Sequence, residues 1–201
     1  MHRCSTSSED AEVVLFAASL SAGSTRDRCA VRPHCCTMSL FPSPLVAALG
    51  AGGLIPFCAL SKPGAAQLDV DNRLGPLRQL LGRPSLNATE LQVTYGCMIL
   101  SFLGAPHWGF ALSGSPPASP RADAFRLVWG VTPSLLAWPC ASTPAPLSLD
   151  ALSAGLAAAM AVDLQCWRAG LVPRSYLSLR VPLTVVAVAS LQSSHARFKA
   201  P

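Results

Sequence analysis

The stretch of sequence that decides the fold is residues 91–113, LQVTYGCMILSFLGAPHWGFALS. It contains no aspartate, glutamate, lysine or arginine, and the charge-free tract continues to residue 120. A helix needs about 20 mostly apolar residues to cross the hydrocarbon core of a bilayer. Residues 35–61 and 127–149 form two further tracts without these charged residues. The pattern predicts an integral membrane protein.

The composition of the whole chain agrees with this prediction. Of its 201 residues, 51% are hydrophobic and 12% are charged, whereas a typical soluble domain is about 25% charged. The formal net charge is +5, but the basic residues lie singly or in pairs between apolar tracts. Because they form no basic stripe with interleaved aromatic residues, the pattern argues against nucleic-acid binding. The expected partners are the lipid bilayer and other membrane protein subunits.

Residues 38–201 are predicted to form an all-α domain, an integral membrane bundle of about five transmembrane helices. The predicted spans are residues 43–61, 92–113, 125–141, 147–167 and 178–193. Every tryptophan and tyrosine lies near an end of a predicted span, which is typical of the headgroup region of a membrane. The polar residues 62–90 carry leucines at helical spacing, so they form either a short interfacial helix or a loop.

Residues 1–37 differ from the rest of the chain. They contain four arginines, six serines and no lysine, as transit peptides to mitochondria or plastids do, although their four acidic residues do not fit that class. We expect an organellar transit peptide or a disordered leader, with Met38 as an alternative start of the protein. The expected location is the mitochondrial inner membrane or a plastid.

Two acidic residues lie in the fourth predicted span, and Asp163 is the one aligned with its small residues. Small residues recur every four positions from Ala151 to Ala159, and Asp163 continues the row. Residues four apart share a helix face, so this row should face the interior of the bundle. An ionisable residue at membrane depth indicates function when it has a partner, and Arg180 of the next predicted span is the natural partner. The alternative is that Asp163 lies at the headgroup boundary and anchors the hairpin.

The one histidine inside a predicted span is His107, which precedes Trp108. A histidine there serves as a proton relay, a haem ligand or a quinone contact, or forms a neutral hydrogen bond to a neighbouring helix. Ligation of haem by two histidines of this chain is excluded, because the other three, among them His195, lie outside the predicted spans. No cofactor is assigned.

The sequence lacks the usual motifs of metal sites and catalysis. No Cys-x-x-Cys pair occurs among the eight cysteines, and the adjacent His34, Cys35 and Cys36 are poorly placed for one tetrahedral ion. The cysteines are expected to be free thiols. No G-x-S-x-G, H-E-x-x-H, phosphate-loop or dinucleotide motif is present. We therefore expect no metal site and no enzyme.

Three blocks of sequence carry a family resemblance. They are residues 95–109 (YGCMILSFLGAPHWG), 129–138 (WGVTPSLLAW) and 163–184 (DLQCWRAGLVPRSYLSLRVPLT). In this order they resemble the transmembrane protein 69-like family, whose central motif matches the block with Tyr95, His107 and Trp108. The similarity runs from about residue 44 to about residue 191, and the long polar first loop departs from it. The resemblance implies a small multi-span membrane protein of bacterial or organellar type, without an assigned activity or catalytic residues.

The expected function is non-enzymatic, an assembly or scaffold component of an organellar inner membrane. The alternative is a small transporter or proton-coupled carrier that uses His107 and Asp163, and a quinone-binding or redox subunit comes third. The polar or aromatic residues singled out for a functional or structural role in the membrane are His107, Asp163, Arg180, Trp108 and Tyr95. A scaffold should co-purify with a larger complex, whereas a carrier should move a solute in proteoliposomes.

Overall fold

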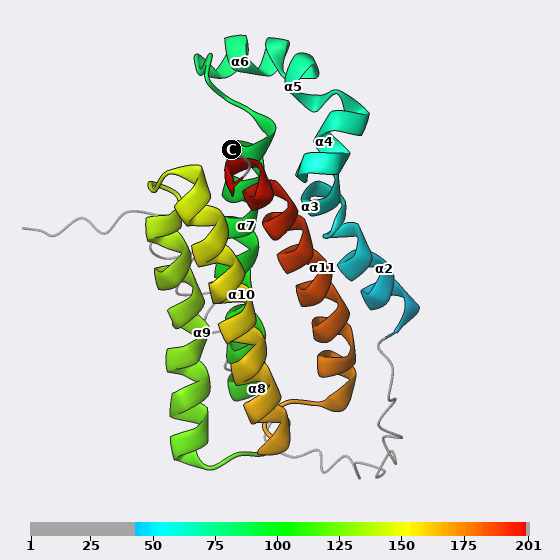
Figure 1. Ribbon diagram of the computed structural model, residues 1–201. Helices are drawn as coiled ribbons and strands as arrows, with labels where there is room; N and C mark the ends of the chain where they lie inside the picture. Colours follow the sequence, from blue (N-terminus) through cyan, green and yellow to red (C-terminus); the bar gives the residue numbers. More distant parts are fainter. Residues whose placement is uncertain (1–42, 200–201) are drawn as a thin grey trace, which may run out of the picture. The chain divides into compact units, whose positions relative to one another are not determined.

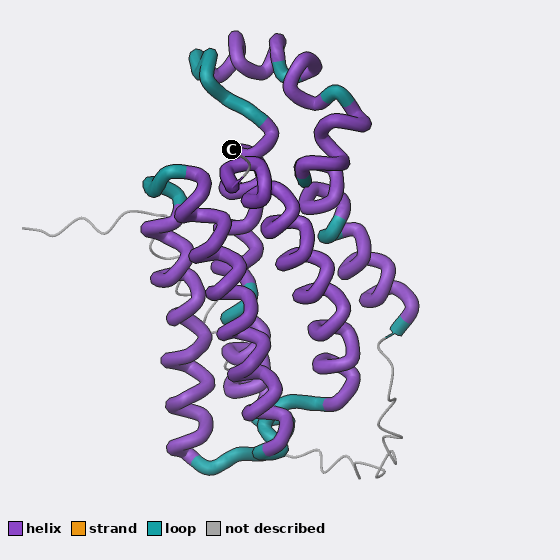
Figure 2. Tube along the Cα trace, in the orientation of Figure 1, coloured by secondary structure: helices purple, strands orange, loops and turns teal. Residues whose placement is uncertain are grey.

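A computed structural model describes residues 43–199, and every regular element in that range is a helix (Figures 1 and 2). The predictions for residues 1–37 and Met38 lie outside the described residues. In chain order the helices are α2 (Pro44–Gly52), α3 (Ile55–Leu60), α4 (Lys62–Leu68), α5 (Val70–Arg73), α6 (Gly75–Leu81), α7 (Ala88–Phe102), α8 (Ala105–Ser113), α9 (Pro120–Cys140), α10 (Ala145–Arg168) and α11 (Arg174–Lys199). The all-α prediction is confirmed.

The long helices pack side by side as a bundle. Helix α10 packs against α11, α9 and α7, while α9 also contacts α7 and α8. Helices α2, α3 and α4 lie against α11, and α3 also contacts α7. The short helices α5 and α6 lie beyond the end of the bundle where α11 finishes (Figure 1). Helices α7 to α11, with α2 and α3 against α11, therefore form the bundle.

Two helices are long and apolar enough to cross a membrane, Ala145–Arg168 and Arg174–Ala196. A third crossing results if Pro44–Leu60 and Lys62–Leu68 form one broken span, since they are bent by 78° at the break. The described residues thus support a helical membrane protein with two or three candidate spans. The count of five stays a prediction.

The helices that contain the second and third predicted spans begin before those spans, and the second span is divided between two helices. The second is divided into α7 and α8 at Leu103 and Gly104. Helix α7 also begins earlier than predicted, because the Asn87 side chain accepts a hydrogen bond from the Glu90 amide at 3.0 Å and caps the helix. Helix α9, which contains the third predicted span, begins at Pro120, because Ser119 caps it in the same way at 3.3 Å. Helix caps, and not the limits of the apolar tracts, set these starting points.

The polar segment of residues 62–90 is largely helical, so the loop alternative is wrong. Two hydrogen bonds hold α5 and α6 against the residues around the start of α7. The Asp71 carboxylate accepts from the Ala88 amide at 2.8 Å, and Arg78 Nε donates to the Leu86 carbonyl at 2.7 Å.

The centre of the bundle is a reciprocal contact between α7 and α10. A side chain at Gly96 would meet Leu152, and a side chain at Gly155 would meet Leu100, so each glycine makes room for a buried leucine of the other helix. The predicted inward row of small residues is only partly right, because Ala151 is exposed. A helix turns about 100° per residue, so twelve residues separate Ala151 from the face of Asp163 by about 120°.

Candidate functional site

A buried cluster of charged side chains joins α8, α10 and α11. His107 Nε2 lies 2.8 Å from Asp163 Oδ1, and Arg180 Nε donates to Asp163 Oδ2 at 2.8 Å. The exposed fractions of these side chains are 0% for His107, 1% for Asp163 and 8% for Arg180. Both oxygens of one carboxylate therefore bind basic groups out of contact with solvent.

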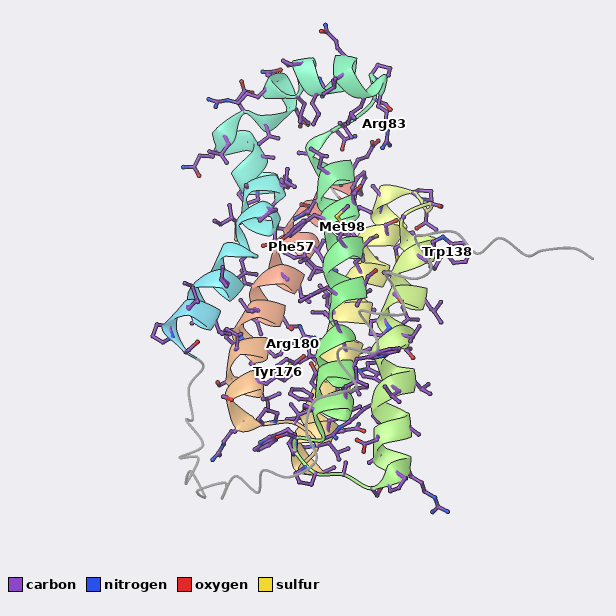
Figure 3. The ribbon with its side chains drawn as sticks, turned by 180° about the vertical axis from the view of Figure 1, so that it is seen from behind. Phe57, Arg83, Met98, Trp138, Tyr176 and Arg180 are labelled. Atoms are coloured by element: carbon purple, nitrogen blue, oxygen red, sulfur yellow. The ribbon has the colours of Figure 1, made fainter. Side chains whose placement is uncertain are left out.

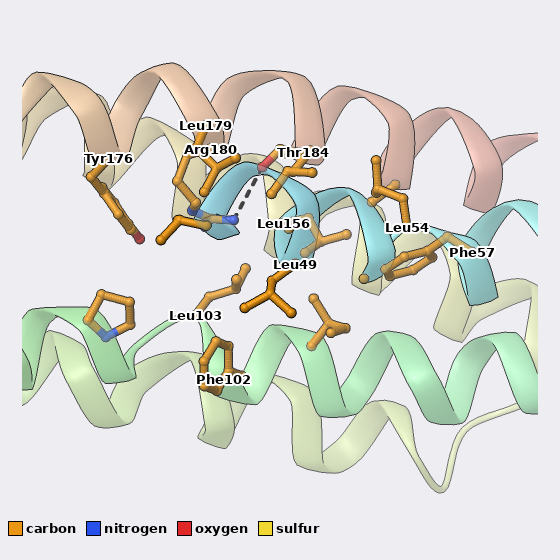
Figure 4. Close-up of a pocket in the computed structure, with 17 residues that line it drawn as sticks. Leu49, Leu54, Phe57, Phe102, Leu103, Leu156, Tyr176, Leu179, Arg180 and Thr184 are labelled. Carbon is orange, nitrogen blue, oxygen red and sulfur yellow. Dashed lines mark hydrogen bonds between the residues drawn. The ribbon is translucent and has the colours of Figure 1, made fainter. Parts of the chain in front are cut away.

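Two hydroxyl groups of α11 extend the cluster. The Tyr176 hydroxyl donates to Asp163 Oδ2 at 3.4 Å. Arg180 Nη1 donates to Thr184 Oγ1 at 3.3 Å (Figure 4). Tyr176 and Arg180 both lie on the side of α11 that faces the other helices (Figure 3). The Phe110 ring stands edge-on to both His107 and Tyr176, with ring centroids 6.2 Å and 5.6 Å away. The Phe110 ring therefore packs beside two residues of the cluster.

Asp163, His107 and Arg180 lie at a similar depth in their helices. Asp163 precedes the end of α10 by five residues, His107 precedes the end of α8 by six, and Arg180 follows the start of α11 by six. At about 1.5 Å per residue, each lies about 7–9 Å inside its helix. The contact between Asp163 and Arg180 is the one predicted from the sequence. The contact with His107 was not predicted, although the similar depths of the two residues could have indicated it.

The charges of the cluster balance when His107 is neutral. Asp163 contributes one negative charge and Arg180 one positive charge, so a charged imidazole would leave a net charge in a buried site. The tautomer with hydrogen on Nε2 donates to Asp163. Nδ1 is then an acceptor, and it has no hydrogen-bond partner among residues 43–199. The His107 contact thus adds α8 to the Asp163–Arg180 pair of α10 and α11.

Trp108 follows His107 in sequence but faces α9 and not the cluster. Its Nε1 donates to the Leu127 carbonyl at 3.0 Å. A Cβ atom at Gly130 would overlap the Trp108 indole, and a Cβ at Gly104 would overlap the Gly130 carbonyl. Trp108 is thus a packing residue at a close crossing of α8 and α9, and this crossing orients His107 toward α10.

Tyr95 also lies apart from the cluster. Its hydroxyl donates to the Gly53 carbonyl at 2.8 Å, and its ring packs edge-on against Phe57 at 5.1 Å between centroids. The fully buried Gln92 donates to the Phe57 carbonyl at 3.1 Å. Both side chains of α7 thus bind backbone oxygens of the broken segment formed by α2 and α3.

Helix α11 extends beyond the fifth predicted span and includes His195. Helix α11 continues to Lys199, and the candidate span within it ends at Ala196. His195 Nδ1 lies 2.6 Å from Asp150 Oδ1, toward the other end of the α10–α11 pair. Helix α11 continues beyond its apolar tract, because polar residues are compatible with a helical backbone.

Arg126 is a further buried charge that the sequence did not single out. It is fully buried, and its guanidinium donates to the Pro116 carbonyl at 3.1 Å and to the Leu171 carbonyl at 2.5 Å. It also pairs with Asp123 at 2.8 Å. Arg126 thereby ties the α8–α9 connection to the α10–α11 connection.

Within residues 43–199, no group of three or more histidine, cysteine or acidic side chains could hold a metal ion. Cys58, Cys97, Cys140 and Cys166 are free thiols. The sequence His34-Cys35-Cys36 lies outside the described residues.

A family model described as "Protein of unknown function (DUF3429)" matches residues 42–196. The chain belongs to this family. It is similar to Transmembrane protein 69 of Xenopus tropicalis, with 36% identity over 148 residues, which cover 73% of the chain and 51% of the relative. The chain thus spans about half the length of that curated relative. No solved structure matches the chain.

Membership of the DUF3429 family confirms the resemblance drawn from the three sequence blocks. The name of the relative and the apolar helices together establish a membrane protein with transmembrane helices. The family description assigns no function.

Proposed function

We propose that the chain is a non-enzymatic scaffold or assembly component of an organellar inner membrane. The observation that carries this proposal is that both oxygens of the Asp163 carboxylate already have partners within the protein. Each carboxylate oxygen of Asp163 already faces a basic side chain at 2.8 Å, and the carboxylate is buried. A carboxylate held in this way fixes α8, α10 and α11 to one another. The contribution of the protein is then expected at its outer surface.

The outer surface of α9 supports this proposal. Large apolar side chains there are exposed, among them Val128, Leu135 and Trp138. Trp138 is 78% exposed and points away from the bundle at the end of α9 (Figure 3). Inside a bilayer such a surface contacts lipid or an apolar face of another subunit.

Five membrane crossings are part of the proposal. Residues 88–113 continue from α7 into α8, a length of about 39 Å at about 1.5 Å per residue, and α9 adds 21 residues. Both lengths suffice for a hydrocarbon core of about 30 Å. The organellar location is supported by the arginine and serine content of residues 1–37. Imaging of the tagged full chain, with protease protection of the tag in isolated organelles, tests both points.

A pull-down in mild detergent, followed by mass spectrometry, tests the scaffold itself. We expect the tagged full chain to recover other membrane subunits in constant ratio. The Asp163→Asn variant should lose them together with its stability, whereas Asp150→Asn, at an exposed carboxylate, should retain them. A wild-type protein that is purified alone, and that catalyses flux in liposomes, would overturn the proposal.

A proton-coupled carrier is the second candidate. The contact of 2.8 Å between His107 and Asp163 favours it, because both groups bind and release protons in membrane carriers. Liposomes that contain a pH-sensitive dye test this candidate. A carrier should show flux that is lost in His107→Gln and retained in Asp150→Asn, whereas a scaffold should show none even as wild type.

A further inference from the structure

A cavity of about 490 Å³ lies beside the charge cluster, within the range of about 300–1,000 Å³ typical of small-molecule sites. Its walls come from α2, α3, the α7–α8 segment, α10 and α11. Tyr176 and Arg180 lie at one end of it, and Leu54 and Phe57 lie at the other (Figure 4). The cavity is therefore elongated, with Tyr176 and Arg180 at one end.

Helix α11 supplies all three polar side chains of the lining, Tyr176, Arg180 and Thr184. The lining residues of α11 recur at helical spacing from residue 176 to residue 187, a distance of about 16 Å at about 1.5 Å per residue. The other lining residues are apolar or glycine. Such a site fits a long hydrocarbon body with one polar end.

Arg180 has hydrogen-bond donors without a partner among the described residues. Its Nε binds Asp163, and its Nη1 binds Thr184. Its Nη2 is buried and has no partner among residues 43–199, although a guanidinium carries five donors. A buried unpaired donor is costly. A ligand oxygen at this end of the cavity would supply the missing acceptor.

We infer that the cavity binds a neutral, lipid-soluble molecule with a long hydrocarbon body and a carbonyl oxygen that accepts from Arg180. Neutrality follows from the charges of the cluster. Asp163 already balances Arg180, so a carboxylate or phosphate ligand would bring an unbalanced negative charge beside a buried ion pair. A carbonyl oxygen satisfies the donor without adding charge.

Two sources offer this chemistry, the ester carbonyl of a neutral acyl lipid and the ring carbonyl of a quinone with a long tail. Three probes distinguish them from an anionic ligand when titrated into the purified full chain in detergent. They are monoolein, a decyl-substituted benzoquinone, and oleate at a pH where it is ionised. We expect saturable binding of at least one neutral probe, and the tighter neutral probe identifies the source. Oleate should bind about tenfold more weakly, from the unbalanced charge.

Two substitutions on α11 test the location of the site. Ala187 is buried and lines the cavity, whereas Val185 is 62% exposed on the outer side of the same helix. Ala187→Phe should abolish binding by filling the cavity, and Val185→Phe should leave the affinity unchanged. Arg180→Lys retains the charge beside Asp163 but loses the planar fork of donors. It should weaken the neutral probe about tenfold.

Three results would overturn the inference. The first is the absence of saturable binding of both neutral probes to the folded wild type. The second is oleate binding as tightly as the better neutral probe, which would show an anion site. The third is full affinity in a folded Ala187→Phe variant. Since none of these measurements involves partner subunits, failure here leaves the scaffold proposal standing.

Discussion

Replacing Asp163 with asparagine removes the negative charge of the buried cluster and changes the side-chain shape little. His107 and Arg180 then lose their carboxylate partner, which is 1% exposed and 2.8 Å from each. Hydrogen bonds inside membrane proteins are worth about 0.6 kcal/mol on average, so two of them account for about 1 kcal/mol. An uncompensated buried charge costs more, about 3–5 kcal/mol. Because Arg180 stays charged, we expect a loss of about 3 kcal/mol.

A double-mutant cycle with Arg180→Gln measures how much of this loss belongs to the ion pair. Each single variant leaves one charge without its partner, whereas the double variant leaves neither. The double variant should therefore be more stable than the sum of the two losses implies, by about 1–3 kcal/mol. The assay is reversible unfolding in mixed micelles titrated with dodecyl sulfate, followed by tryptophan fluorescence.

The matched control is Asp150→Asn at the other His–Asp contact. The Asp150 side chain is 52% exposed and lies 2.6 Å from His195, and exposed ion pairs are worth about 0–1 kcal/mol. We expect Asp150→Asn to cost less than about 1 kcal/mol. Additive losses at Asp163 and Arg180, or equal losses at Asp163 and Asp150, would refute the reasoning.

Three further predictions concern packing and membrane insertion. Gly104→Leu and Gly130→Leu should each prevent correct folding, since even a Cβ there overlaps the facing helix, whereas Gly109→Leu, with open space around it, should fold normally in gel filtration. Tyr95→Phe should lower the free energy of unfolding by about 0.6 kcal/mol, through the lost hydrogen bond to Gly53, and an unchanged value would show that this bond is not stabilising. The chain should stay in the membrane pellet after carbonate extraction, and recovery in the supernatant would contradict a transmembrane protein.

The sequence alone determined the class of the protein and one contact of the charge cluster. Its charge-free tracts leave no polar surface for a soluble fold, and a helix satisfies its backbone hydrogen bonds within itself, so an all-α membrane protein follows. Asp163 and Arg180 are 17 residues apart on consecutive helices. A short hairpin brings the end of one helix to the start of the next, so this pair was predictable.

Tertiary structure decided which faces of distant helices meet. His107 is 56 residues from Asp163, and their contact depends on the close crossing that Gly104 and Gly130 allow. The cavity beside Arg180 likewise needs α2 and α11 to lie together, although more than 120 residues separate them in the chain. Hydrophobicity directs a helix into the membrane but does not fix its rotation or its neighbours. Those depend on how particular side chains and glycines fit together, which the periodicity of a single chain does not record.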